Sequence, residues 1–153
     1  MRITRALIAL IVVCLSSGCF LLEQDELMVC EYTPLNGSLS YEVSYLGDDI
    51  HEIKIVHESD ISMFDQSVKD QKLDDYEKEV DEHNKVDGLD AELIVDKDLV
   101  MVIIDVDTKV YDVDEDAHNI FAVDFNEDDF KTPKTLRDKL DTHDFKCDPV
   151  VNE

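Results

Sequence analysis

The chain has few glycines and few basic residues, and each shortage argues against particular classes of function. It contains 4 glycines and 3 prolines in 153 residues. No glycine-rich phosphate-binding loop and no Gly-x-Ser-x-Gly turn for a nucleophilic serine occurs in it. Lysine and arginine number 14 against 38 acidic residues, which gives a net charge of −24. Such a surface repels phosphate backbones, which argues against nucleic-acid binding and against direct docking on anionic lipid.

The chain also lacks an apolar run long enough to cross a bilayer. The run from Ala6 to Leu15 is shorter than the roughly 20 residues that a spanning helix needs. It follows Arg2 and Arg5 and precedes the small residues 16–18. Basic, then apolar, then small is the order of a cleaved export signal. We therefore expect a signal peptide over residues 1–18.

The segment Ser16-Ser17-Gly18-Cys19 resembles a lipobox, in which the cysteine carries diacylglycerol and becomes the mature N-terminus. Ser17 and Gly18 fit the small positions, whereas Ser16 departs from the leucine that is usual there. The resemblance implies lipidation of Cys19, followed by a short tether over residues 19–27. The lipid would hold the protein on the extracytoplasmic face of the cell membrane without a spanning helix. Plain secretion, with Cys19 as an ordinary thiol, is the alternative.

Two of the four cysteines remain for the folded part of the chain. Cys14 leaves with the signal peptide and Cys19 is assigned to the lipid, which leaves Cys30 and Cys147. Because an exported protein can form disulfides, we predict a bridge between these two residues. For so long a loop the chain-entropy model gives about 4–5 kcal/mol. Two buried free thiols are the alternative, and a zinc site is disfavoured because neither cysteine has a close Cys or His partner.

Alternating apolar and polar residues predict an antiparallel meander at the start of the fold. Leu39, Tyr41, Val43 and Tyr45 alternate with polar residues, which is the period of a half-buried strand. A later segment, 99–113, has apolar residues on both faces, which is typical of a central strand or one covered by a helix. Strands are predicted at residues 28–33, 39–45, 53–55, 91–95 and 99–113, and Phe145-Lys146-Cys147 is predicted to lead into a short final strand.

Two segments change to helical spacing. Between residues 60 and 84 apolar residues recur every three to five positions, and Ser59, Asp60 or Ser62 could cap the helix. Thr132-Pro133 predicts the start of a second helix, which buries Leu136 and Leu140. We therefore predict one α+β domain over residues 28–150. It should have an antiparallel sheet of about five strands and two helices packed on one face.

The most tempting ligand site is an acidic run. Asp112, Asp114 and Asp116 have the spacing that begins an EF-hand calcium loop. However, Ala117 stands where that loop needs glycine, and Val123 stands where it needs a bidentate glutamate. A solvated acidic loop is the preferred interpretation. The histidines are isolated in sequence, so we predict no metal site, no cofactor and no catalytic residues.

The layout resembles the YehR-like small bacterial lipoproteins, a family of unknown function. The resemblance rests on the early Met28-Val29-Cys30, the hairpin from Leu39 to Ile55, and Lys134 to Leu140 followed by Phe145-Lys146-Cys147. It implies an α+β fold and an envelope location, and it brings no catalytic residues. The unusual acidity and the Asp-rich segment 96–129 depart from the family pattern.

The leading hypothesis is a lipid-anchored, non-enzymatic extracytoplasmic domain that binds an unknown envelope protein or small ligand. The alternative is an acidic surface protein that binds Ca²⁺. A binding domain predicts an apolar pocket or an exposed sheet face in the fold. A cation-binding protein predicts carboxylates that converge on one point.

Overall fold

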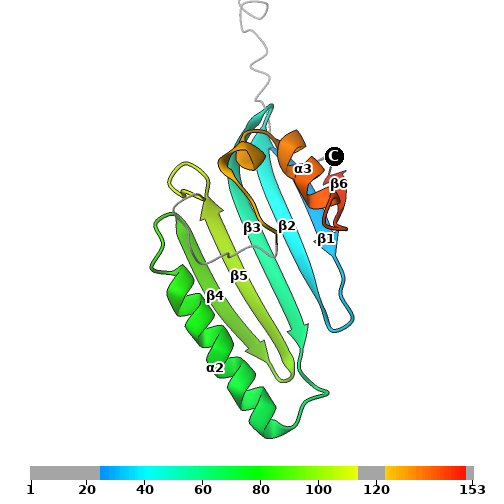
Figure 1. The fold of residues 1–153 in the computed structure, drawn as a ribbon, viewed down its shortest axis with the longest axis vertical. Coiled ribbons are helices and arrows are strands. Elements are labelled where there is room, and N and C mark those ends of the chain that lie inside the picture. The colour runs from blue at the N-terminus through cyan, green and yellow to red at the C-terminus, as the bar shows by residue number, and fades with distance from the viewer. Residues whose placement is uncertain (1–24, 114–122, 151–153) are drawn as a thin grey trace, which may run out of the picture.

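A six-stranded antiparallel sheet organises the chain, with the strand order β4-β5-β3-β2-β1-β6. This computed structural model describes residues 25–113 and 123–150 (Figure 1). The strands are β1 (Glu26–Tyr32), β2 (Gly37–Leu46), β3 (Asp49–Asp60), β4 (Leu89–Asp96), β5 (Leu99–Asp107) and β6 (Lys146–Val150). The helices are α2 (Gln66–His83), α3 (Pro133–Asp141) and a short 3₁₀ helix, η1 (Glu127–Phe130).

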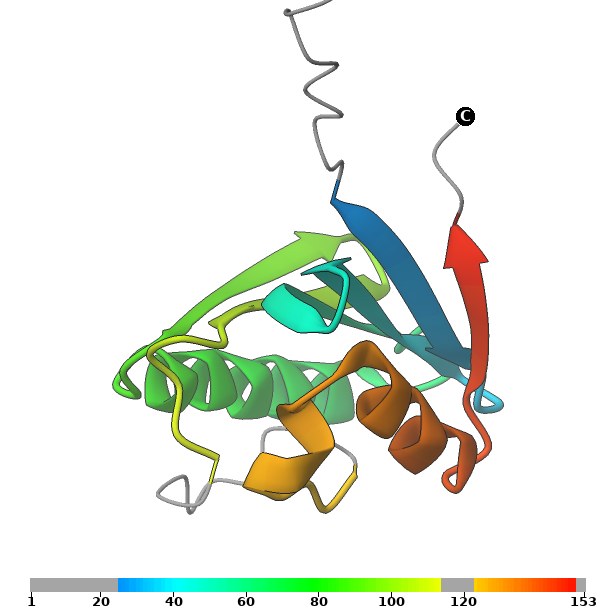
Figure 2. The same ribbon diagram turned by 90° about the horizontal axis from the view of Figure 1, so that it is seen from above.

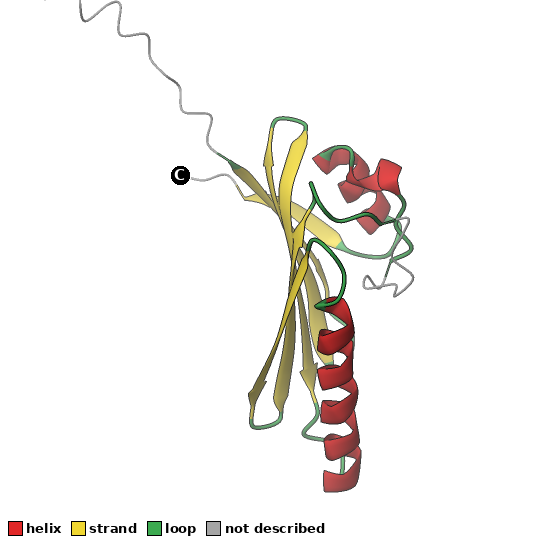
Figure 3. Ribbon diagram, turned by 90° about the vertical axis from the view of Figure 1, so that its left-hand side faces the viewer, coloured by secondary structure: helices red, strands yellow, loops and turns green. Residues whose placement is uncertain are grey.

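The predicted fold class is confirmed. The sheet is antiparallel, β1, β2 and β3 form a meander, and both helices lie on one face of the sheet (Figure 3). The sheet has six strands, one more than the approximate number expected. β1 begins at Glu26, so the last residues of the segment predicted as a tether pair within the sheet.

Side chains of period two line the core between the sheet and the helices. Tyr41, Ile55 and Ile104 lie side by side across β2, β3 and β5, and all three are buried. Val43, Ile53 and Val106 form the next row and are completely buried. Burying an aliphatic side chain of this size contributes about 1.5–3 kcal/mol. The alternation read from the sequence therefore identifies the core face correctly.

The long helix starts later than the sequence pattern indicates. β3 continues to Asp60, which pairs with Leu99 of β5, and the Asp60 carboxylate accepts a hydrogen bond from Ser62 N at 2.8 Å. The helix cap is Asp65, whose carboxylate accepts from Val68 N at 3.0 Å. The predicted caps at Ser59, Asp60 and Ser62 are therefore wrong, because sheet pairing holds Ser59 and Asp60 extended and Ser62 lies in the turn before Asp65.

The second helix begins as predicted. Thr132 caps α3 with its side chain, and proline occupies the first turn. Leu136 and Leu140 are completely buried beneath it. α3 lies beside β1 and β6, whereas α2 lies beside β4, so the two helices cover different halves of one sheet face (Figures 1 and 2).

Candidate functional site

The two cysteines of the folded part form a disulfide, as predicted. Cys30 of β1 lies directly opposite Cys147 of β6, and their sulfur atoms are bonded. Cys30 is completely buried within the core. The bridge therefore fastens the last strand to the first. The segment predicted as a signal peptide and Cys19 both lie outside the described residues, among which no helix is long and apolar enough to cross a membrane.

One face of the sheet carries no helix from the described residues 25–113 and 123–150 (Figure 3). Four apolar side chains adjoin on this uncovered face. Val56 of β3 lies opposite Ile103 of β5, and Met101 of β5 lies opposite Ile94 of β4. Three of them are half-buried and Ile94 is 37% exposed. We call Val56, Ile94, Met101 and Ile103 the aliphatic patch.

Carboxylates surround the aliphatic patch. Glu58 lies opposite Met101, Glu92 lies opposite Ile103, and Asp105 follows on the same face of β5. Lys54 lies opposite Asp105, and its amine approaches that carboxylate to 3.8 Å. Acidic side chains outnumber basic ones around the patch. The surface is therefore apolar at the patch and mainly acidic around it.

The end of the uncovered face beyond the patch is a shallow hollow lined with acids. Asp90 lies directly opposite Asp105, and Glu52 lies directly opposite Asp107. Like charges placed opposite each other on adjacent strands destabilise a sheet. Among the described residues, no three His, Cys, Asp or Glu side chains are placed to hold a metal ion. The acidic run that begins at Asp112 continues into residues 114–122, which lie outside the described part.

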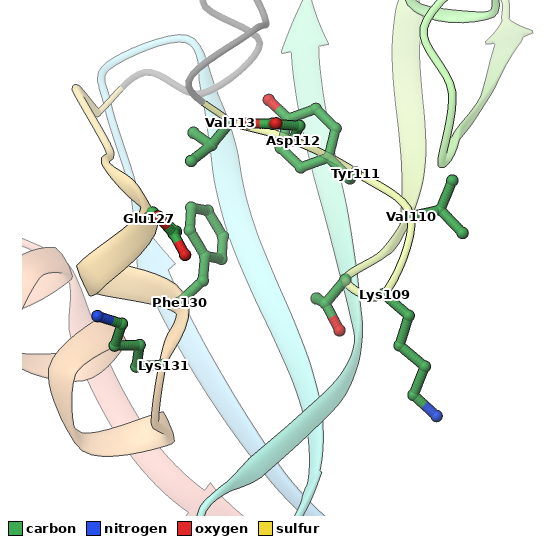
Figure 4. Close-up of a pocket in the computed structure, with 9 residues that line it drawn as sticks. Lys109, Val110, Tyr111, Asp112, Val113, Glu127, Phe130 and Lys131 are labelled. Atoms are coloured by element: carbon green, nitrogen blue, oxygen red, sulfur yellow. The ribbon is translucent and has the colours of Figure 1, made fainter.

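A second cavity of about 510 Å³ lies between the segment after β5 and η1 (Figure 4). Tyr111, Val113 and Phe130 give it apolar walls, and Glu127 and Lys131 stand at its rim. The hydrogen bond from Lys131 to Asp128 raises the pKa of this lysine above its usual value. The cavity borders residues 114–122, so the described residues do not define its full lining and assign no ligand to it.

A cluster of side chains between α2 and the sheet was not predicted from the sequence. His83 is 3% exposed, and neither ring nitrogen has a hydrogen-bond partner among the described residues. Its Nε2 lies 3.6 Å from the Glu79 carboxylate, an ion-pair distance that is too long for a good hydrogen bond. His57 of β3 stacks edge-on against Tyr76 at 6.0 Å. The proximity of His83 lowers the pKa of Glu79.

The comparisons with known proteins support the fold alone. No family model matches the chain, and no curated protein matches it. One solved structure, the NMR structure of the protein from Streptococcus pneumoniae TIGR4, is similar with a TM-score of 0.54 at 15% identity. The match covers 80% of this chain and 84% of that one. The resemblance to the YehR-like lipoproteins stays a prediction.

Proposed function

We propose that the protein is a lipid-anchored, non-enzymatic domain of the cell envelope that binds an envelope partner through the uncovered face of its sheet. The aliphatic patch carries this proposal. Single exposed apolar residues are ordinary on a protein surface, whereas adjoining ones rimmed by polar groups are typical of interaction sites. Val56, Ile103, Met101 and Ile94 adjoin across three neighbouring strands, with Glu58 and Glu92 beside them.

The proposed anchor fits the position of the first strand. A fully extended chain from Cys19 to Glu26 reaches about 25 Å at most. A lipid on Cys19 would therefore keep the start of β1 within that distance of the membrane surface, which suits a partner that resides in the envelope. The calcium alternative has no supporting observation among the described residues, because no three of their His, Cys, Asp or Glu side chains are placed to hold a metal ion.

Photo-crosslinking in intact cells tests the proposal. A photoreactive side chain at Ile103 should give one discrete adduct, whereas the same group at Lys134, on the exposed surface of α3, should give none. Cys19→Ala should release the protein into the medium and abolish the adduct. Equal labelling from both positions would contradict the binding face. Retention of the Cys19→Ala protein in the membrane fraction would contradict the anchor.

A further inference from the structure

The outer edge of β4 is closed at one point by a side chain. Asn84, which caps the C-terminus of α2, accepts a hydrogen bond from Ala91 N at 2.7 Å and donates one to Ala91 O at 2.9 Å. The amide thus replaces the strand that would otherwise pair at Ala91. Because both backbone groups of Ala91 point away from β5, the alternate residues Leu93 and Val95 must also point theirs outward.

The rest of this edge is open. Within the described residues, no hydrogen bond is made by the outward N–H and C=O groups of Leu93 and Val95. Val95, whose side chain is on the face that carries α2, is 46% exposed, and Ile94, on the uncovered face, is 37% exposed, so this stretch of β4 reaches solvent on both faces. An unpaired, exposed and apolar strand edge is a template for another strand. The opposite edge is different, because β6 is short and contains Pro149, which has no N–H to offer.

We propose that an extended, basic peptide segment of a partner protein adds as a strand to β4 at Leu93–Val95. This inference rests on the proposed function and names the chemistry of the partner. Strand addition draws affinity from backbone hydrogen bonds and specificity from alternate side chains. Alternate side chains of the added strand would lie on the uncovered face. There they would be next to Glu92 and Asp96, which lie on either side of Ile94.

The charges of β4 favour a basic segment over a second copy of this chain. In an antiparallel pair of two β4 strands centred on Ile94, Glu92 of one copy would lie opposite Asp96 of the other. Like charges in that position oppose pairing. Lysine or arginine at the same positions would instead pair with both carboxylates. The net charge of −24 adds long-range attraction for a basic segment.

A synthetic peptide tests the inference on the folded chain. The probe is an acetylated and amidated peptide of alternating lysine and valine, added to isotope-labelled protein and observed by NMR. We expect shifts at the Leu93 and Val95 amides, slower hydrogen exchange there, and weaker binding as salt rises. Valine N-methylation removes the N–H groups that would face β4 and should abolish binding. A peptide with glutamate in place of lysine should not bind.

A matched pair of variants tests the charge assignment. Glu92→Gln combined with Asp96→Asn should weaken the lysine peptide roughly two- to tenfold. Asp141→Asn, at an exposed carboxylate of α3, should leave its binding unchanged. Either unchanged binding by the Glu92 and Asp96 variant or equal binding of the N-methylated peptide would overturn the inference. So would absence of binding at millimolar peptide, or a concentration-dependent dimer that pairs through β4.

The inference and the proposed function can fail separately. If Ile103 still crosslinks in cells while no basic peptide reaches β4, the binding face stands and strand addition is wrong. If the peptide adds to β4 while crosslinks from Ile103 and Lys134 are equal, strand addition stands and the aliphatic patch is not the cellular interface.

Discussion

The two helices pack against opposite halves of the same sheet face in different ways. α3 spans nine residues and completely buries Leu136 and Leu140. α2 is twice as long, with 18 residues, and His83 is its only buried residue. The half beneath α3 also contains the disulfide and the aromatic rings of Tyr41, Phe125 and Phe145. We call the half of the sheet beneath α3 the α3 half, and the half beneath α2 the α2 half.

We expect the α3 half to be the more stable of the two and the α2 half to open more easily. In the α3 half, Tyr41 contacts Phe125 and Phe145 at centroid distances of 6.0 and 5.2 Å, and such pairs add to the burial of each ring. In the α2 half, the helix is held by half-buried side chains, the Asn84–Ala91 pair and the Lys69–Asp98 ion pair at 2.5 Å. Segments with fewer buried contacts open at lower free energy. The proposed binding edge lies in the half that opens more easily.

Removing the disulfide should have the largest effect on stability. Cys30→Ala combined with Cys147→Ala removes the link between β1 and β6, so the free energy of unfolding should fall by about 4 kcal/mol. Urea denaturation measures this loss, and wild-type protein under reducing conditions is the control. A loss below about 1 kcal/mol would show that packing alone holds the α3 half together.

Truncating one leucine in each helix compares the halves directly. Leu136→Ala opens a cavity in a completely buried site and should cost about 3 kcal/mol. Leu73→Ala in α2 removes a half-buried side chain and should cost about 1 kcal/mol. Both values come from chemical denaturation at one pH. Equal costs would remove the distinction between the halves.

The buried phenol of Tyr41 should make the folded protein less stable at alkaline pH. Burial raises the pKa of Tyr41 above its ordinary value. The folded state therefore favours the neutral phenol. Its contribution to stability is full below the unfolded pKa of about 10 and is lost as pH rises towards the higher folded pKa. Through this group, the free energy of unfolding should fall by up to about 1.4 kcal/mol per pH unit above pH 10.

Tyr41→Phe should remove the contribution of this phenol to the pH dependence of the free energy of unfolding, measured between pH 9 and 11.5. Tyr32→Phe, which removes a phenol that is 40% exposed and keeps the ring against Phe145, is the matched control. An equal flattening of the curve in the two variants would contradict the role of Tyr41.

Local sequence patterns predict those parts of the fold that depend on residues close together in the sequence. Alternation identified the rows of Tyr41 and Ile53, and Thr132-Pro133 identified the start of α3, because both depend on neighbours in sequence. The start of α2 was placed too early because long-range pairing extends β3 to Asp60. The short helix η1 was missed, although Asn126 and Asp129 form a capping box at its start.

The candidate site was only partly readable from the sequence. The apolar residues Met101 and Ile103 on the second face of β5 were visible, but a helix or a central position explained them equally well. Only the placement of both helices shows that no helix within residues 25–113 and 123–150 covers this face (Figure 3). The packing of α2 beside β4 produces both the Asn84–Ala91 pair and the buried His83. No local sequence pattern predicts either feature.

Hydrogen exchange of backbone amides in the free, wild-type protein tests the central claim most directly. The measurement compares Ala91 with Leu93 and Val95 on the same edge, with Val43 in the completely buried row as the internal reference. We predict that Val43 exchanges only through global unfolding, that Ala91 is protected by Asn84, and that Leu93 and Val95 exchange close to the rate of an unstructured chain. If Leu93 and Val95 are as well protected as Ala91, the edge is closed and the account of an open binding strand is wrong.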